Sequence, residues 1–395
     1  MATANSTQPL ADQPELTSSN DTSQGPSPDT TADVTNKLAN EARISSGPSS
    51  ENIPPTGGVI KNLFPHPLPT AQPVPLPALT ADQEAKYNDL LKTASSWTEI
   101  ADSAAKNPPK SPITEDERMW LTKECLLRYL RASKWNLHHA EQRVLGTMTW
   151  RREYGVEGFT SEYISPENET GKQIIFGYDI NGRTCHYMAP ARQNTKKSDR
   201  QIHHVVWMLE REIDILPPGQ ETICLLINFK ESSSGSNPSI AQGKQVLDIL
   251  QNHYPERLGR ALIINVPWFV WGFFKVITPF IDPLTREKLH FNEDLTKHVP
   301  PSQLTKAFGG EVDFEYDHSV YWPGLTQLAE QRRKDMHERW VKGGKQIGEH
   351  EGYLRGGIEK SLSGLSAQPS GGGSVEEKKT LETTVQSLGD LSIQA

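Results

Sequence analysis

Apolar positions are distributed very unevenly along this chain of 395 residues. Both ends are rich in Pro, Gly, Ser and Thr and show no periodic apolar positions, whereas the middle shows apolar residues at helical or strand spacing. Segments of the first kind bury too little apolar surface to offset chain entropy. We therefore predict disordered tails at 1–80 and 342–395, with a folded region between them.

The first part of the folded region, residues 81–155, has the pattern of an all-helical module. Thr80 and Thr114 each begin a capping box, in which a threonine precedes a Gln or a Glu by three residues. We expect the second box to open one helix running through MWLTKECLLRYLRASKW. Asn136 is expected to cap a third helix, in which apolar residues recur at spacing four.

The part from 156 to 322 alternates between strand and helix patterns. Asn181-Gly182 lies between two strand-like runs, which is a strong β-hairpin signal. Near-continuous apolar strands between helices predict an α/β domain whose sheet is covered by helices. The expected order is a hairpin at 174–188, a helix at 198–215, a strand at 223–229, a helix at 239–254, a strand at 260–266 and a final helix at 323–341.

Composition and charge exclude several classes of protein. A net charge of −8 argues against a nucleic-acid binder that works through a basic surface. Three widely spaced cysteines exclude a disulfide scaffold and a cysteine zinc site, and they suit a reducing compartment. The N-terminus lacks a secretory signal pattern. Because no phosphate-binding glycine loop or nucleophile motif is present, we expect no enzyme, no cofactor and no metal site.

Two polar groups in one helical stretch resemble functional sets but have unsuitable spacing. His203 and His204 are adjacent, whereas metal ligands on a helix face lie three or four residues apart. Glu210, Glu212 and Asp214 lie two apart, so they diverge around a helix. We expect helix-surface or boundary histidines and a solvated acidic face.

The segment 261–280 is almost wholly apolar over about the length of a membrane span. Pro267 and Pro279 oppose a transmembrane helix because they break it near both ends, and Asn265 and Lys275 would be costly in hydrocarbon. The preferred interpretation is a buried strand followed by a short helix without a polar face. Such a helix is either buried on all sides or in contact with something apolar that comes and goes, for which lipid is the natural candidate.

A candidate phosphate site follows this segment. Asp282 can cap a turn whose first residue is Pro283, which places Thr285 and Lys288 three residues apart on one side. A hydroxyl donor and an ammonium at that spacing suit a phosphodiester. The residues alone favour an ordinary surface turn with Lys288 in water.

These segments resemble the CRAL-TRIO lipid-binding family, and within it the fungal phosphatidylinositol transfer proteins, over about 115–322. The resemblance implies a CRAL-TRIO α/β domain with a mixed sheet and an apolar lipid pocket, preceded by a helical module. Strings such as GYDINGR, LPPGQET and DHSVYWP look most like the sub-branch linked to azole and multidrug resistance. The segments that occur in the family's order and spacing are LLRYLRASKW, WRREYG, YPERLGR, IINVPW, FIDPLTREK and FGG.

The resemblance also implies roles for individual residues in a lipid-exchange cycle. Thr285 and Lys288 match a family pair that holds the lipid phosphate, and Glu256 matches a residue that orders the inositol. Arg128, Arg131 and Lys134 form a candidate basic rim, although Ser133 replaces a basic residue that related proteins carry. The mobile gate helix over the pocket is implied to present Trp268, Phe269, Trp271, Phe273, Phe274 and Ile277.

One departure from the family bears on lipid selectivity. Members that also bind phosphatidylcholine carry a Ser and a Thr two apart on a strand, with tyrosines that cradle the choline. Here those strand positions are Ile223 and Leu225, and one tyrosine position is His186. Because Ile and Leu donate nothing to a phosphate, we expect phosphatidylcholine to bind weakly or not at all. The freed apolar surface leaves a sterol as a candidate second ligand.

We therefore expect a lipid transfer protein that exchanges single phosphatidylinositol molecules between membranes and influences phosphoinositide signalling and membrane composition. Expected partners are phosphatidylinositol, transient membrane surfaces and phosphatidylinositol kinases, without nucleic acid; the oligomeric state is open. The expected location is the cytoplasm, peripherally on membranes such as the endoplasmic reticulum, lipid droplets or the cell periphery. Rival interpretations are a carrier or sensor of sterols or other apolar ligands, a membrane-anchored regulator, and a lipid-modifying enzyme.

Overall fold

The computed structural model describes residues 58–64, 66–233 and 239–366. Its N-terminal helices form a module with its own apolar core, which includes Leu90, Leu126 and Met148. Both expected capping boxes are present, because Thr80 and Thr114 accept from the backbone three residues on. The helices of this module are α2 (Ala81–Ser96), α3 (Glu115–Trp120), α4 (Lys123–Ala132) and α5 (Leu137–Tyr154).

Two expectations for this module are wrong. It is not all-helical, because β1 (Glu99–Ala101) and β2 (Lys110–Pro112) pair antiparallel between α2 and α3. The expected second helix is two helices, since Thr122 interrupts it. The Thr122 hydroxyl accepts from the Cys125 backbone N–H at 3.1 Å, so it caps a new helix instead of continuing the old one.

The second part of the chain is built on a five-stranded mixed sheet, which confirms the α/β prediction. The expected hairpin is present, because β3 and β4 pair antiparallel across the Asn181-Gly182 turn. The other neighbours are parallel. In spatial order the strands are β3 (Gln173–Tyr178), β4 (Thr184–Met188), β5 (Ile223–Asn228), β6 (Leu258–Ile264) and β7 (Leu289–Phe291).

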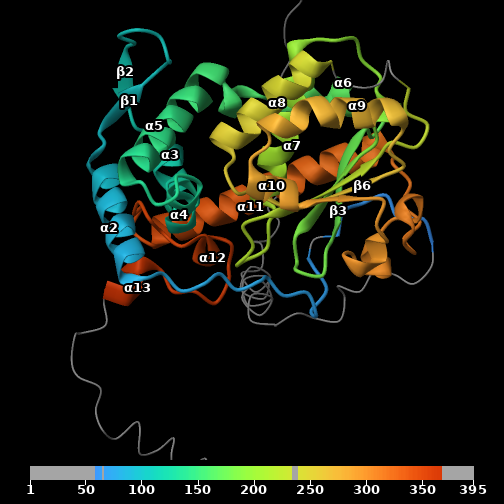
Figure 1. Cartoon of the computed structure of the whole chain (residues 1–395). Helices are drawn as coiled ribbons and strands as arrows, with labels where there is room; N and C mark the ends of the chain where they lie inside the picture. Colours follow the sequence, from blue (N-terminus) through green and yellow to red (C-terminus); the bar gives the residue numbers. More distant parts are fainter. Residues whose placement is uncertain (1–57, 65, 234–238, 367–395) are drawn as a thin grey trace, which may run out of the picture. The chain divides into compact units, whose positions relative to one another are not determined.

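Helices cover this sheet and form the outer layers of the domain. Alternate residues of β5 separate its two faces: Cys224 and Leu226 lie in the main core with Tyr321 of the long helix α11, whereas Leu225 is half-buried on the other face. Figure 1 shows α9 alongside α8. The helices are α6 (Ser161–Asn168), α7 (Asp199–Asp214), α8 (Ile240–His253), α9 (Trp268–Ile277), α10 (Pro283–Glu287) and α11 (His318–Lys342).

Short helical turns complete the described part of the chain. Among the described residues, no helix has the length and apolarity needed to cross a membrane. The segment 261–280 instead divides between β6, α9 and a turn. The 3₁₀ turns are Val156–Gly158, Pro190–Arg192, Thr278–Phe280, Leu295–Lys297, Pro301–Gln303 and Lys306–Phe308, and the last two helices are α12 (Glu351–Leu354) and α13 (Leu362–Ser366).

The disorder prediction for the C-terminal tail is wrong over residues 342–366. The helix expected at 323–341 is longer on both sides, and α12 and α13 follow it. Glu351 and Leu354 are buried. The composition of this segment is polar because much of what it buries is ion pairs, which an apolar count does not register.

The disorder prediction for the N-terminal tail is also wrong near its end. The Ile60 backbone N–H donates to the Asp313 carbonyl at 2.8 Å, and the Phe64 ring lies 4.6 Å from the Phe176 ring. The parts of the two predicted tails at 1–57 and 367–395 lie outside the described residues.

Candidate functional site

Helix α9 has the bounds that the sequence predicts, and it is buried on one side only. Val270 and Ile277 are buried, whereas Trp268 is 85% exposed and Val276 is 46% exposed. The interpretation as a core helix buried on all sides is therefore wrong. An apolar helix that keeps large side chains in water has the property expected of a surface that meets lipid.

The buried side of α9 packs against α8 and the edge strand β7. The Phe291 ring lies 4.9 Å from the Trp271 ring and 5.2 Å from the Phe274 ring. Gly243 in α8 makes room for the helix, because a Cβ built there would lie 2.6 Å from Phe273 Cζ and 3.2 Å from Ile277 Cδ1. These contacts are made by ring edges and methyl groups, without an ion pair.

Other exposed apolar side chains come from the elements next to α9. The Lys244 ammonium on α8 lies 5.4 Å from the centroid of the Phe280 ring, so a cation accompanies the apolar groups. The exposed apolar side chains of α8, α9, the turn after it and α10 are Ile240, Trp268, Trp271, Val276, Phe280 and Leu284.

The predicted headgroup residues gather at the start of β7. Lys288 directly precedes this strand, is half-buried, and donates through Nζ to the Leu258 carbonyl at 2.7 Å. Burial lowers the pKa of Lys288, while the carboxylates of Glu256 and Asp282 partly oppose that shift. An additional anion near this ammonium would stabilise its charged form.

Glu256 is held on the turn before β6 by one of the predicted rim residues. Its Oε2 accepts from Arg131 Nε at 2.5 Å. The backbone of Glu256 has a φ of +57°, in the left-handed region that side chains disfavour. The structure thus brings Glu256, Arg131 and Lys288 into one electrostatic neighbourhood.

Thr285 lies one turn before Lys288 in α10. As predicted, Asp282 caps this turn, because its Oδ1 accepts from the Thr285 backbone N–H at 2.9 Å. The Thr285 side chain is half-buried. Its role in binding a phosphate stays a prediction.

The basic rim is not formed as predicted. Arg128 is buried, with 3% of its side chain exposed, and it is paired with Glu221 and Glu351. Only Lys134 of the three residues is exposed. Arg128 therefore belongs to the interior, because a buried guanidinium surrounded by carboxylates is not available to a lipid at the surface.

The positions linked to phosphatidylcholine lie together on one face of the sheet. His186 and Leu225 are register partners on β4 and β5, and Ile223 is buried two residues before Leu225. His186 is engaged on both ring nitrogens, at 2.7 Å from Glu212 Oε2 and 3.1 Å from Gln173 Oε1. Neither aliphatic side chain offers a donor.

The expectation of a solvated acidic face on α7 is wrong. Glu210, Glu212 and Asp214 are all buried. Glu210 accepts from Arg151 at 2.6 Å, which helps to lower its pKa to about 2 although burial alone would raise it. His204 is also buried, and neither of its ring nitrogens has a hydrogen-bond partner among the described residues.

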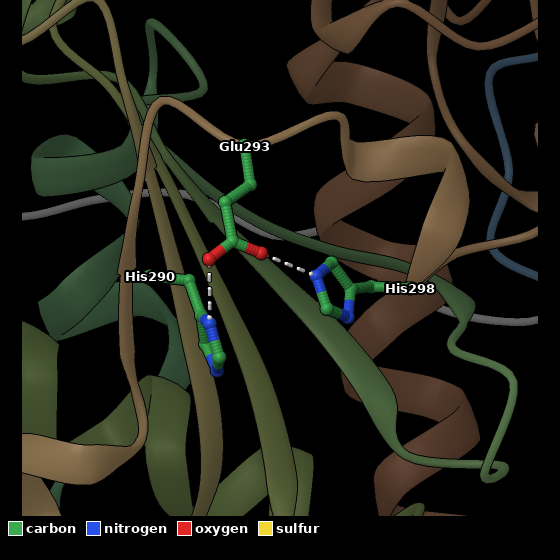
Figure 2. Close-up of side chains that lie close together, drawn as sticks. All are labelled: His290, Glu293 and His298. Carbon is green, nitrogen blue, oxygen red and sulfur yellow. Dashed lines mark hydrogen bonds and ion pairs between the residues drawn. The ribbon is translucent and has the colours of Figure 1, made fainter.

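A further cluster lies on the loop after β7, where the Glu293 carboxylate sits between two imidazoles (Figure 2). It lies 3.0 Å from His290 Nδ1 and 2.9 Å from His298 Nε2. His298 Nδ1 is 3.0 Å from Arg260 Nη1, which can only donate, so Nε2 carries the proton of the neutral ring. The two imidazoles and the carboxylate satisfy one another through these contacts, and we interpret the cluster as a hydrogen-bonded group.

Sequence reasoning missed two acids that organise the arginines of α4. Glu221 Oε2 accepts from Arg128 at 2.7 Å and from Arg131 at 3.2 Å. Glu351 accepts from Arg128 at 2.6 Å. Arginines three residues apart indicate nearby acids only if the helix face is known to be buried, and the sequence does not identify which acids those are.

Comparison with known proteins identifies the class. Residues 168–310 match the CRAL/TRIO domain, and residues 86–145 match the CRAL/TRIO N-terminal domain. The phosphatidylinositol transfer protein PDR17 of Saccharomyces cerevisiae is 36% identical over 301 residues, which cover 71% of this chain and 85% of PDR17. The chain therefore belongs to the CRAL-TRIO family, whose members bind or transfer lipids and are not enzymes.

Other relatives agree on the family and differ in length. The CRAL-TRIO domain-containing protein C23B6.04c of Schizosaccharomyces pombe is 50% identical over 326 residues, which cover 80% of this chain. The same alignment spans only 32% of that longer protein. The SEC14 cytosolic factor of Kluyveromyces lactis is 27% identical over 212 residues, covering 48% of this chain and 70% of the relative.

Proposed function

We propose that this protein extracts single phosphatidylinositol molecules from membranes and exchanges them between membrane surfaces, with weak or no binding of phosphatidylcholine. In this role it supplies phosphatidylinositol to lipid kinases and influences phosphoinositide signalling. The likeness to PDR17, a phosphatidylinositol transfer protein, supports the choice of lipid.

The observation that carries the proposal is that α9 and Lys288 both lie next to the short edge strand β7. Phe291 at the end of β7 packs against the rings of α9, and Lys288 directly precedes the strand. At ~3.3 Å per residue, three strand residues separate the two features by about 10 Å. Acyl chains under α9 would thus leave a lipid phosphate close to the ammonium.

The physical problem in lipid transfer is exposure of acyl chains to water. At ~0.8 kcal/mol per methylene, about 30 methylenes give a gross cost on the order of 20–25 kcal/mol. No bond is made or broken, so a protein needs only an apolar enclosure, an apolar surface that meets the membrane and a site for the headgroup. The partly exposed helix α9 supports the second of these roles.

Three side chains support the headgroup assignment. The Lys288 ammonium and the Thr285 hydroxyl can donate to a phosphodiester, and Glu256 can accept from inositol hydroxyls. The oxygens of a lipid phosphate would also accept hydrogen bonds from the Lys288 ammonium, in place of the water that burial has removed from it. The apolar Ile223 and Leu225 offer nothing to the phosphate of a choline lipid.

The test is the lipid content and the transfer activity of a Lys288→Ala variant. A charged hydrogen bond contributes ~1.5–3 kcal/mol, so we expect phosphatidylinositol transfer to fall by about ten- to a hundred-fold with the fold intact. Lys306→Ala, which removes an exposed ion pair with Asp313, is the matched control and should transfer normally.

Mass spectrometry of lipid extracted from the native protein should show phosphatidylinositol in near-stoichiometric amount and little phosphatidylcholine. A sterol or phosphatidylcholine as the main ligand would contradict the headgroup chemistry. Equal transfer by Lys288→Ala and the unchanged protein would contradict the assignment of the site.

A further inference from the structure

A continuous chain of alternating charges joins the C-terminal segment, residues 343–366, to the predicted headgroup residues. Glu351 Oε1 accepts from Arg128 Nη2 at 2.6 Å, and Arg128 Nη1 donates to Glu221 Oε2 at 2.7 Å. The same oxygen of Glu221 accepts from Arg131 Nη2 at 3.2 Å. Arg131 then donates through Nε to Glu256 at 2.5 Å.

This series of charged side chains begins at Glu351, whose carboxylate is shared by several buried cations. Besides Arg128, Glu351 Oε1 lies 3.7 Å from Arg257 Nη2, and Glu351 Oε2 lies 3.8 Å from Arg355 Nη2. Thr122 also donates to Glu351 at 3.0 Å. The three arginines hold the pKa of Glu351 far below its usual range, so this carboxylate is ionised throughout the physiological range.

The geometry of the chain leaves Glu256 few alternative positions. The Arg131 guanidinium is planar, so its bond to Glu221 through Nη2 fixes where Nε points. Glu221 in turn shares one oxygen between Arg131 and Arg128. Arg128 is fixed from its other nitrogen by Glu351, so a change at Glu351 propagates through each planar group toward Glu256.

We propose that the C-terminal segment is a positioning element for the headgroup site and that Glu351 is its positioning residue. This inference rests on the proposed function, because it assigns Glu351 to the same phosphatidylinositol site. The segment lies beyond both regions matched by the family, 86–145 and 168–310. Glu351 touches no proposed lipid group and acts through Arg128, Glu221 and Arg131.

The surroundings of Glu351 favour a variant that still folds. Arg128, Arg257, Arg355 and Glu351 line a cavity of about 110 Å³, which is roomy enough for several water molecules. Water in this polar cavity can solvate a guanidinium that loses its partner. Glu351→Gln keeps the shape of the side chain but removes the charge that holds Arg128, so only a neutral hydrogen bond can fix that guanidinium from this side.

The experiment compares phosphatidylinositol transfer between vesicles by the full chain and its Glu351→Gln, Glu256→Ala and doubly substituted variants. Coupling within such networks leads us to expect that Glu351→Gln lowers transfer about ten-fold. Because Glu351 acts through Glu256, the double variant should transfer no worse than Glu256→Ala alone. Lys345→Ala, which removes an exposed ion pair of the same segment with Glu115, should transfer normally.

Each other outcome overturns the inference in a distinguishable way. Normal transfer by Glu351→Gln, or losses that multiply in the double variant, would show that Glu351 does not act through Glu256 while leaving the lipid site intact. If Lys288→Ala also transfers normally, the headgroup site itself is wrong. If Glu351→Gln does not fold, a variant that combines Glu351→Gln with Arg355→Gln replaces it, because it removes one charge of each sign. Transfer by this variant should be lower than that of the unchanged protein, and adding Glu256→Ala should not lower it below that of Glu256→Ala alone.

Discussion

Two imidazoles inside the fold are neutral because burial disfavours their charged form. His253 stacks on Trp150 with ring centroids 4.1 Å apart, and its Nδ1 lies 3.0 Å from the Thr147 hydroxyl. Burial lowers the pKa of His253 to about 4 and lowers the pKa of His204 well below its usual range. At the residue scale, these groups make the folded state sensitive to mild acid.

We predict that the free energy of unfolding falls as the pH is lowered from 7 to 5. An unfolded imidazole takes up its proton near pH 6.5, whereas folded His253 does so near pH 4, so the unfolded chain binds more protons in that window. Because His253 is partly exposed, we expect its share to be only about 1 kcal/mol. Urea unfolding at the two pH values measures it.

His253→Gln should reduce this loss, and His139→Gln on the exposed face of α5 should leave it unchanged. The carboxylates contribute at lower pH, since Glu210 protonates only near pH 2. If the unfolding free energy of His253→Gln falls as steeply with pH as that of the unchanged protein, His253 is not the source of the pH dependence.

The three cysteines are predicted to be unreactive in the folded protein. Cys125, Cys185 and Cys224 are all buried, and burial raises the pKa of Cys125 to about 11 and the pKa of Cys185 well above its usual value. The thiolate is the reactive form, so a disulfide-exchange reagent at pH 8 should modify none of them until urea is added, and three thereafter. Rapid modification of one thiol without urea would show that its region opens.

The partners of the buried acids on α7 could not be predicted from the sequence. The spacing of Glu210, Glu212 and Asp214 shows correctly that they diverge around a helix, but α7 is covered on several sides. Glu212 meets Thr184 and His186 on the sheet, while Glu210 meets Arg151 on α5. Those partners lie at least 26 residues away in the chain, so no local pattern predicts the pairing.

At the scale of elements, the contact between α8 and α9 decides how tightly the proposed gate closes. Gly243 of α8 lies against the Phe273 and Ile277 side chains, because a Cβ built there would be 2.6 Å and 3.2 Å from them. On the same helix as those side chains, Gly272 has nothing within 4 Å of a built Cβ. The two glycines therefore separate the effect of packing from the effect of helix propensity.

We predict that Gly243→Ala loosens α9 while Gly272→Ala does not. The added methyl group overlaps Phe273, and overpacking of this kind costs about 1–3 kcal/mol. At Gly272 the same change should be neutral or stabilise the helix by up to ~1 kcal/mol. Hydrogen exchange of the α9 amides should be faster in Gly243→Ala only; equal exchange in both variants would show that α9 does not depend on this contact.

Elements with local signals could be predicted, and those set by distant contacts could not. Pro267 and Pro279 delimit α9, Asp282 caps α10, and Asn181-Gly182 closes the β3–β4 hairpin. The gathering of Glu256, Lys288 and Thr285 follows the family resemblance. The β1–β2 pair and the break at Thr122 depend on packing within the module, because neither has a turn or periodicity signal strong enough to predict it.

At the scale of the whole folded region, the C-terminal segment ties the helical module to the α/β domain. Its Gly348 N–H donates to the Leu121 carbonyl at 2.7 Å in the module. Its Arg355 guanidinium donates to the Ile213 carbonyl at 2.7 Å at the end of α7. Backbone hydrogen bonds and ion pairs make this connection, so the segment needs polar residues. The same polar composition led to the prediction of disorder.

We predict that a chain ending at Lys342 is much less stable than one ending at Ser366. The shorter chain loses Glu351, so Arg128 and Arg257 keep only Glu221 as a counter-charge. Removing one partner of a buried pair typically costs about 3–5 kcal/mol. In a domain of this size that corresponds to a fall in Tm of about 10 °C.

The longer chain keeps every described contact of the segment and should melt like the full chain. Thermal unfolding followed by circular dichroism compares the three. Equal Tm values would mean that the arginines find other partners, and that the segment does not connect the two parts of the fold.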